Sequence, residues 1–309
     1  MIKKFAIKKF MIISLSFIIL LLLYLFPESD KYKINTTLTY IEPKTIPIYL
    51  VDNNNYVSRF EVIRKSENTL DLVDEIIDNL TIGYNDGYIP NNFKKIIPKN
   101  TTILSKELEN SLLKINFSKE LLNVDIKSEE KMLEAIIYSL TEIKDIKKIM
   151  IFVEGNNLKE LPNSKKKLPL VLDRNYGINK VYDLNSMKNI NKVTTYYVSK
   201  NNNLTYYTPI TCISNDKDEK IKIIIEKLKT NPTYNTNLVS YLKTSAELQN
   251  YEILENSVNL SFNNKILALD DDKIIEEVKY SIALSVKDSY QINETIFYVD
   301  NNLIDVLII

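Results

Sequence analysis

Histidine and tryptophan are absent from this chain of 309 residues, and cysteine and glycine are rare, with 1 and 4 residues. Without histidine the chain cannot form a Ser-His-Asp or Cys-His catalytic arrangement, a His-ligated zinc site or an imidazole acid and base. The few glycines leave no phosphate-binding loop, dinucleotide-binding turn or nucleophile elbow. We identify no catalytic, cofactor-binding or metal-ligating residues, expect no cofactor, and predict that the protein is not an enzyme.

Charge is balanced, with 40 Lys and Arg residues against 40 Asp and Glu residues. A chain without a global positive field lacks the usual means of holding a polyanion, so we predict no nucleic-acid partner. The only cysteine, Cys212, lies in an apolar stretch and has no disulfide partner within the chain. We expect its side chain to fill space in a hydrophobic core.

The longest apolar run covers residues 10–26, near the lower limit of length for crossing a bilayer core of about 30 Å. Because lysines stay on the cytoplasmic side, we predict that residues 1–28 form a cytoplasmic tip and a single-pass anchor in the cell membrane, with the later domains outside the cytoplasm. Residues 24–28 offer no small residues for cleavage, which favours an anchor over a signal peptide. Residues 29–45 are polar and predict a stalk. The lysines that precede the run are Lys3, Lys4, Lys8 and Lys9.

The second half of the chain repeats the first about 146 residues later. Three pairs of segments match in the same order: 46–55 with 195–203, 113–118 with 258–263, and 151–156 with 297–302. The repeat predicts two domains of one fold, at 46–156 and 193–309. Residues 157–192 between them are too long for an ordinary connection and form either a linker or a lead-in extension of the second domain.

Hydrophobic periodicity predicts the order β-β-α-β-β-α-β in each half, and therefore an α/β (α+β) fold behind the transmembrane helix. In the first half, strands are expected at 46–51, 56–63, 101–108, 112–117 and 149–153, with helices at 72–80 and 128–140. In the second half, strands are expected at 195–198, 204–213, 251–254, 257–262 and 295–299, with helices at 221–228 and 274–282. We expect helix N-terminal caps at Ser128, near Asn215 and at Asp270–Asp272.

A penicillin-binding arrangement is a weak alternative. Ser128 and Lys131 form a Ser-x-x-Lys motif, and Lys243–Ser245 and Ser261–Asn263 resemble the other two elements of that family. Their order is wrong, they fall in different repeats, and a capping role already accounts for Ser128. We therefore favour helix capping.

Acidic residues have similarly simple explanations. Asp270–Asp272 could bind calcium, but the run lacks the spacing and the glycine of a calcium loop and suits a helix N-terminus better. Glu134, Glu142 and Asp145 are expected on the solvated face of a helix. A glycosidase pair of carboxylates stays open, because only their separation in space is diagnostic.

Two small open-sheet modules would expose strand edges, which are templates for pairing with other chains and favour a binding or assembly role. The tyrosine pairs at 196–197 and 206–207 could serve such a surface, but half-buried packing is the commoner role of strand tyrosines.

The first half resembles the GerM domain of sporulation and spore-germination proteins, in residues 46–51, 97–101, 113–122, 135–142 and 149–155. Arg174 and Gly177–Asn179 resemble the lead-in to a second copy in tandem GerM proteins. The second copy is degenerate: Tyr241–Thr244 replaces the Pro-Lys-Asn-Thr turn, and Asp300–Asn301 replaces Glu154–Gly155.

This resemblance implies a fold similar to the ring-building motif and a non-catalytic part in endospore formation or germination. It carries over no catalytic residues. Tandem GerM proteins are often lipoproteins, whereas this chain has a lysine-flanked apolar span and no cysteine near it. We expect the first copy to hold the family's usual contact and the second to be specialised or supportive.

Three functions remain open at the level of sequence. The first is a membrane-anchored protein that assembles with other sporulation membrane proteins or with itself. The second is a protein that binds or processes the peptidoglycan of the spore cortex. The third is a sensor of a soluble ligand, which would show a closed apolar pocket within or between the modules.

Overall fold

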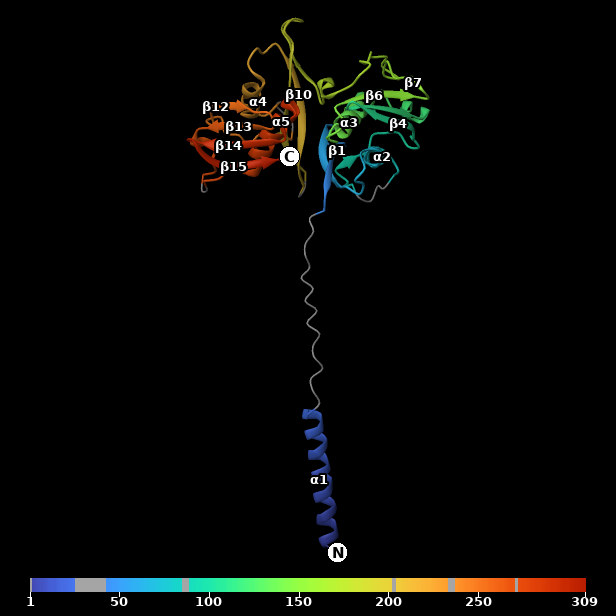
Figure 1. Ribbon diagram of the computed structural model, residues 1–309, viewed down its shortest axis with the longest axis vertical. Coiled ribbons are helices and arrows are strands. Elements are labelled where there is room, and N and C mark those ends of the chain that lie inside the picture. Colours follow the sequence, from blue (N-terminus) through green and yellow to red (C-terminus); the bar gives the residue numbers. More distant parts are fainter. Residues whose placement is uncertain (1, 26–42, 85–88, 202–203, 233–236, 270–271) are drawn as a thin grey trace. The chain divides into compact units, whose positions relative to one another are not determined.

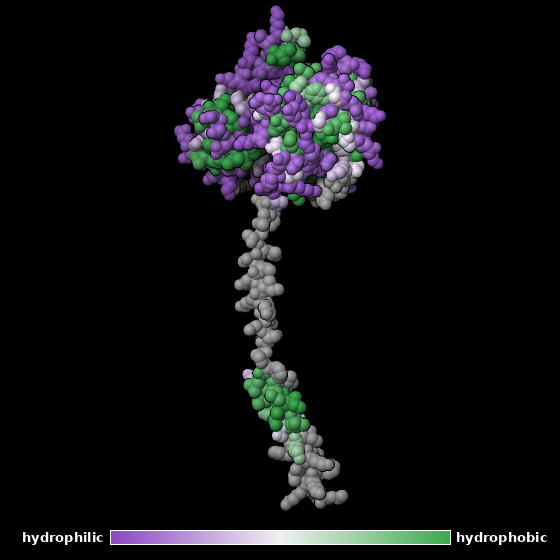
Figure 2. Space-filling model, turned by 45° about the vertical axis from the view of Figure 1, so that its right-hand side comes forward, coloured by the Kyte–Doolittle hydropathy of each residue, from purple (hydrophilic) through white to green (hydrophobic). Residues whose placement is uncertain are grey.

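The computed structural model describes residues 2–25, 43–84, 89–201, 204–232, 237–269 and 272–309 (Figure 1). Helix α1 spans Ile2–Leu25 and exposes apolar side chains such as Phe17, which is 70% exposed (Figure 2). Among the described residues, none of the helices combines the length and the apolarity that crossing a membrane requires. The anchor therefore stays a prediction. Most of the expected stalk lies outside the described residues.

Residues Pro43–Ile309 form one compact unit. Its first half contains β1 (Thr45–Asp52), β2 (Val57–Ile63), α2 (Thr69–Leu80), β3 (Phe93–Lys94), β4 (Ile103–Glu109), β5 (Leu112–Phe117), α3 (Glu129–Leu140), β6 (Lys148–Val153) and β7 (Asn156–Asn157). Its second half contains β8 (Val181–Asp183), β9 (Asn191–Asn201), β10 (Leu204–Ser214), α4 (Lys220–Leu228), β11 (Leu238–Val239), β12 (Leu248–Ile253), β13 (Ser257–Phe262), α5 (Glu276–Tyr290), β14 (Glu294–Val299) and β15 (Asn302–Ile308). The expected order is present in both halves, with short additional strands and with β15, which the sequence analysis missed. The domain limits at 46–156, 157–192 and 193–309 stay predictions.

Each half has its own four-stranded sheet, in the orders β4-β5-β6-β7 and β12-β13-β14-β15. The central pairs β5 with β6 and β13 with β14 are parallel, and the remaining pairs are antiparallel. The long hairpins β1-β2 and β9-β10 instead join in one sheet, in the order β11-β9-β10-β2-β1-β3, and β8 pairs with β10. The join is antiparallel and places Tyr207 opposite Arg59.

This join corrects the expectation that the modules leave their sheet edges free. The edge of β2 is occupied by β10 of the same chain, because an open edge strand pairs readily with another strand of suitable register. Edge strands β4, β12 and β15 of the two smaller sheets have one neighbour each among the described residues.

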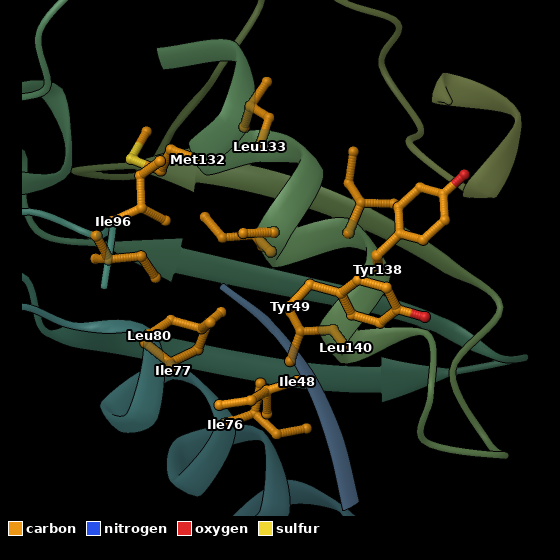
Figure 3. Close-up of a cluster of buried hydrophobic side chains, with 14 of the residues drawn as sticks. Ile48, Tyr49, Ile76, Ile77, Leu80, Ile96, Met132, Leu133, Tyr138 and Leu140 are labelled. Atoms are coloured by element: carbon orange, nitrogen blue, oxygen red, sulfur yellow. The ribbon is translucent and has the colours of Figure 1, made fainter. Parts of the chain in front are cut away.

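The first hydrophobic core lies between β1, the helices α2 and α3 and the sheet behind them (Figure 3). Ile48, Leu80 and Ile136 are completely buried there. The periodic apolar faces of the helices explain this arrangement, because burial of such a face is the main source of helix stability in a domain. A second core forms around β13, α4 and α5.

Second-half residues also enter the first core. Tyr196, Tyr206 and Leu284 belong to the cluster built mainly from the first half. The two tyrosines are 1% and 4% exposed, which confirms packing rather than a surface role. Cys212 is free and buried, as predicted.

Ser128 takes the N-cap position of α3, as expected, but its side chain makes no capping hydrogen bond, and the caps of α4 and α5 are Glu219 and Ile275. Ser128 has helical backbone angles, and Asp125 Oδ1 accepts the backbone N–H of Ser128 at 3.1 Å. Helix α4 begins at Lys220, and Asn215 instead accepts from backbone N–H groups of a neighbouring loop. Helix α5 begins at Glu276, beyond Asp272, and Asp270 and Asp271 lie outside the described residues.

Candidate functional site

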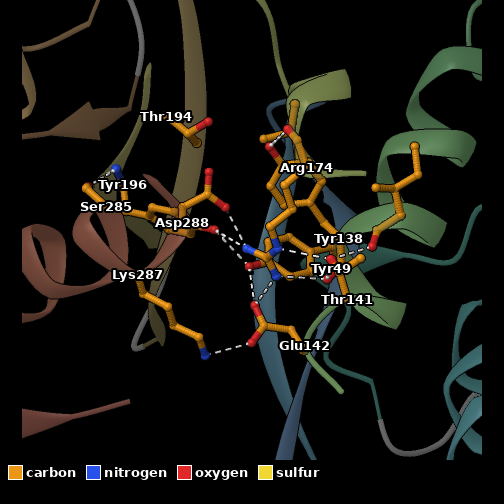
Figure 4. A network of polar contacts seen from close by, with 12 residues as sticks. Tyr49, Tyr138, Thr141, Glu142, Arg174, Thr194, Tyr196, Ser285, Lys287 and Asp288 are labelled. Atoms are coloured by element: carbon orange, nitrogen blue, oxygen red, sulfur yellow. Dashed lines mark hydrogen bonds and ion pairs between the residues drawn. The ribbon is translucent and has the colours of Figure 1, made fainter. Parts of the chain in front are cut away.

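Arg174 lies at the centre of a buried charge cluster where the two halves meet (Figure 4). It begins a short 3₁₀ helix in the segment between the predicted domains. Its guanidinium nitrogens lie 2.6 Å from Glu142 Oε1, just after α3, and 2.6 Å from Asp288 Oδ1 in α5. It also donates to Thr141 Oγ1 at 3.0 Å and to the carbonyl oxygen of Tyr138 at 3.2 Å. One cation thus holds a carboxylate from each half.

Equivalent residues of the two repeats surround this cation. The hydroxyls of Tyr49 and Tyr196 lie 2.9 Å apart, and the Tyr49 hydroxyl also donates to Glu142 Oε1 at 2.9 Å. In each half the backbone N–H of this tyrosine donates to a helix serine, Ser139 at 2.8 Å and Ser285 at 2.9 Å. The repeat therefore forms a pseudosymmetric pair of strand–helix contacts that meet at the tyrosine hydroxyls.

The cations of this cluster shift the pKa values of its two buried carboxyl groups, Glu142 and Asp288. Burial alone would raise the pKa of Glu142, but Arg174, Lys287 and Arg59 outweigh it and hold that pKa well below its usual value. Lys287 Nζ contributes directly, 3.0 Å from Glu142 Oε2. Burial raises the pKa of Asp288, and Arg174 offsets part of that rise. A carboxylate held by several cations and closed off from solvent suits structural cohesion better than proton transfer.

Glu134 and Glu142 correct the expectation of a solvated helix face. The Glu134 residue is 3% exposed and the Glu142 side chain 2%. Lys180 Nζ lies 2.7 Å from Glu134 Oε1, and the backbone N–H of Asn179 donates to Glu134 Oε2 at 3.1 Å. Asp145 is exposed, as expected. Glu134 and Glu142 can be buried because Lys180 and Arg174, from the segment between the halves, pair with them.

Asn179 joins the β1-β2 and β9-β10 hairpins at the seam, which is the line where β2 and β10 meet. Its side-chain oxygen accepts the Val57 N–H at 2.9 Å, and its side-chain nitrogen donates to the carbonyls of Val57 and Pro209, both at 2.8 Å. This amide takes the place of a strand neighbour at the start of β2 and in the middle of β10. Next to it, Ser58 Oγ lies 2.7 Å from Thr208 Oγ1 across the same seam.

Sequence reasoning identified Arg174 and Asn179 only as part of a family resemblance and missed their contacts. A usable signal was present, because Glu142 and Asp288 occupy equivalent places in the two repeats. No rule of periodicity connects either acid with Arg174, which lies 32 residues from the first of them.

The penicillin-binding residues do not form a site. Asn263 and Ser245 approach each other, with Asn263 Nδ2 donating to the Ser245 carbonyl at 3.1 Å. Ser128 lies at the start of α3 in the other half, and within the described part of the chain no hydrogen bond joins it to Ser245 or Asn263. Within the described part of the chain, no group of three His, Cys, Asp or Glu residues is placed to hold a metal ion.

The fold and the cluster define a tandem protein of two mixed α/β modules that share a sheet. The family model described as Germane, sporulation and spore germination, matches residues 47–159. The chain is 28% identical to spore germination protein GerM of Bacillus subtilis (strain 168) over 246 residues, covering 77% of this chain and 67% of that protein. The solved tandem GerMN domains of GerM from Bacillus subtilis have the same fold, with a TM-score of 0.77, 24% identity, and coverage of 84% of this chain and 92% of that one.

The match over residues 47–159, the 28% identity to GerM and the shared fold confirm the resemblance of this chain to tandem GerM-domain proteins of sporulation and spore germination. These relatives are named for sporulation and spore germination and not for a chemical reaction.

Proposed function

We propose that the protein is a non-enzymatic scaffold of sporulation or germination, anchored in the cell membrane, whose two modules bind partner proteins or further copies of the chain outside the cytoplasm. The observation that carries this proposal is the fusion of both modules into one sheet, held by the Arg174 cluster. Such a body presents its remaining sheet edges in a fixed relative geometry. Preorganised surfaces of this kind lose little entropy when a partner binds.

Strand β15 is the edge best suited to such a contact. It is a seven-residue strand that pairs with one other strand in the described part of the chain, and Leu303 and Ile308 are 59% and 72% exposed. Exposed apolar edge strands are templates for pairing, and soluble proteins usually protect them with charges or cover them. The contact at β2 and β10 shows that edge pairing already operates within this chain.

The membrane anchor rests on the apolar run at 10–26 and on the lysines before it. If it is correct, the full-length chain will sediment with membranes after an alkaline carbonate wash. Protease added outside the cytoplasmic membrane will remove Pro43–Ile309. Recovery in the soluble fraction would overturn the anchor and leave the scaffold proposal standing.

The scaffold role is tested by crosslinking and capture of the tagged full-length chain from sporulating cells. We expect recovery of further copies of the chain or of defined membrane partners, with reduced yield for Leu303→Lys. Leu170→Lys is the matched control, because Leu170 is 58% exposed and lies outside the strands. Recovery of neither copies nor membrane partners by the native chain would exclude the proposal.

Binding to or turnover of the spore cortex is the alternative function. Cosedimentation with purified cortex, followed by analysis of released muropeptides, separates the two. Retention on the cortex without protein partners would favour the alternative, and release of fragments would also show that the chain is an enzyme.

A further inference from the structure

A cavity of about 790 Å³ lies between the two halves of the compact unit. Its walls come from the β1-β2 hairpin, the loop between α3 and β6, the start of β9 and the end of α5. The volume falls within the range of roughly 300–1,000 Å³ that is usual for small-molecule sites. The lining is mainly charged, unlike the closed apolar pocket that a sensor was expected to show. We call this cavity the intermodule cleft.

The acidic side chains of the cleft are already occupied. Eight Lys and Arg side chains line it against six from Asp and Glu. Four of the acids form ion pairs: Glu142 and Asp288 with Arg174, Glu61 with Arg59, and Glu67 with Lys44. Asp145 and Asp173 instead accept hydrogen bonds from neutral donors, the Thr69 hydroxyl and the Asn175 backbone N–H.

Several cations of the cleft, in contrast, lack a carboxylate partner. Among the described residues, Lys144, Lys147 and Lys220 form no ion pair, and Lys192 Nζ donates only to a backbone carbonyl, that of Asn175, at 3.0 Å. Two of these lysines come from the loop after α3 and two from the second half. The excess positive charge is therefore shared by both modules.

Arg59 provides a second, independent observation. Its side chain is 10% exposed and lines the cleft, and one of its terminal nitrogens binds Glu61 at 2.9 Å. Its Nε is buried and has no hydrogen-bond partner. A buried donor without an acceptor is costly and rare in native proteins. An oxygen of a bound anion would satisfy it.

The lysines also repel one another. Burial lowers the pKa of Lys147, and the neighbouring Arg174, Lys287 and Lys144 lower it further. A negative ligand would remove this repulsion, because an opposite charge stabilises the protonated form of lysine.

We propose that the intermodule cleft is a binding site for a multivalent oxyanion, a ligand with two or more carboxylate or phosphate groups, which lies between the modules and is held by Arg59 together with Lys144, Lys147, Lys192 and Lys220. The source of the oxyanion is either a free solute or an acidic segment of a protein, since both offer the same charged oxygens. The proposal does not depend on the scaffold function, because the charges that support it are all within this chain.

Isothermal titration of the purified full-length protein at low ionic strength tests the cleft with three probes: citrate, pyrophosphate and tetraglutamate peptide. We expect saturable binding of at least one probe with a dissociation constant of about 1 mM or tighter, weakened by added salt. The Nε–H resonance of Arg59 should shift on saturation. Binding of the peptide alone identifies a protein segment as the source, and binding of citrate or pyrophosphate shows that a free solute is sufficient.

Two double variants, one inside the cleft and one outside it, show whether the probe binds in the cleft. Lys144→Gln with Lys147→Gln should weaken binding by about tenfold or more. Lys127→Gln with Lys265→Gln removes the same charge from exposed positions outside the cleft and should leave the affinity unchanged. All four lysines are exposed, so both proteins should fold. The proposal is wrong if none of the probes binds saturably, or if the control pair weakens binding as much as the cleft pair.

Discussion

At the scale of single residues, Arg174 has the greatest structural role. Its guanidinium is the only group joined by ion pairs to both Glu142 and Asp288 among the described residues, and its Cζ atom also lies 4.8 Å from the centre of the Tyr138 ring. Replacing a buried ion pair by apolar residues is often harmless, but removing one partner leaves an uncompensated charge. Arg174 therefore compensates the charges of two buried carboxylates at once.

Arg174→Ala should lower the free energy of unfolding by about 3 kcal/mol or more, because both carboxylates would be left without their shared cation. Urea denaturation followed by circular dichroism measures the change. Lys44→Ala is the control, since the side chains of Lys44 and its partner Glu67 are 70% and 71% exposed, and such pairs contribute about 1 kcal/mol or less. Equal losses in the two variants would contradict the central role of Arg174.

Glu142 should make stability sensitive to acid. Because its pKa in the folded state lies below the ordinary value of 4.5, its stabilising contribution is complete above that value and is lost as the pH falls below it. Asp288 acts in the opposite direction, since its raised pKa favours proton uptake by the folded state. At neutral pH the Glu142→Gln variant should have a lower free energy of unfolding than the native protein. When the pH falls, that free energy should decrease less in the variant than in the native protein.

Urea unfolding at a series of pH values between roughly 3 and 7 tests this difference. Glu226→Gln, at a side chain that is 67% exposed, serves as the control and should follow the native protein. Parallel pH profiles for the native protein and Glu142→Gln would show that Glu142 is not the linked group.

At the scale of elements, the turns explain why the degenerate second repeat keeps its fold. Glu154 and Gly155 both have positive φ angles, of 47° and 76°, between β6 and β7. Asp300 and Asn301 adopt angles of 48° and 67° at the equivalent place between β14 and β15. Asn and Asp tolerate this left-handed region better than other residues with a Cβ, so the turn survives the loss of glycine.

Most helices and strands could be predicted because their apolar residues repeat with the period of the element. Leu72 and Ile76 are 3% and 0% exposed on α2, as their spacing predicted. The charge cluster could not be predicted in this way, since Glu142 has the same local pattern whether it is solvated or paired with Arg174. The joined sheet was also hidden, because the register of β2 against β10 depends on contacts between distant segments such as those of Asn179.

Gly177 fixes the path of the segment that carries Arg174 and Asn179. It has a φ of 79°, and a Cβ at this position would lie 3.1 Å from Thr211 Cγ2. Gly177→Ala should therefore cost about 2 kcal/mol, from backbone strain and crowding together. Gly155→Ala separates the two effects, because Gly155 has a similar φ of 76° and no atom within 4 Å of the added carbon. Thermal unfolding should give Gly177→Ala a lower melting temperature than Gly155→Ala. A lower melting temperature for Gly155→Ala would contradict the close contact with Thr211.

At the scale of the whole molecule, the repeat is symmetric in its strands and helices but not in its central cluster. Among the described residues, Glu142 forms ion pairs with both Arg174 and Lys287, whereas the only cation paired with Asp288 is Arg174. Exchange of the two copies would place the wrong acid beside each cation. The expectation that the two copies have different roles stays a prediction, and the asymmetric cluster supplies a physical reason to expect that an exchanged protein is less stable.

The two halves should unfold together. Tyr196, Tyr206 and Leu284 of the second half lie in the hydrophobic core of the first, and the shared sheet and Arg174 add polar contacts across the same boundary. We expect calorimetry of the native protein to show one transition for the compact unit, with a ratio of calorimetric to van't Hoff enthalpy of about 1. Arg174→Ala combined with Tyr196→Ala removes the shared cation and a shared core residue, and should divide the unfolding into two transitions. The exposed pair Lys127→Ala and Leu170→Ala should retain one transition. Two transitions in the native protein would mean that the two halves unfold independently despite their shared sheet.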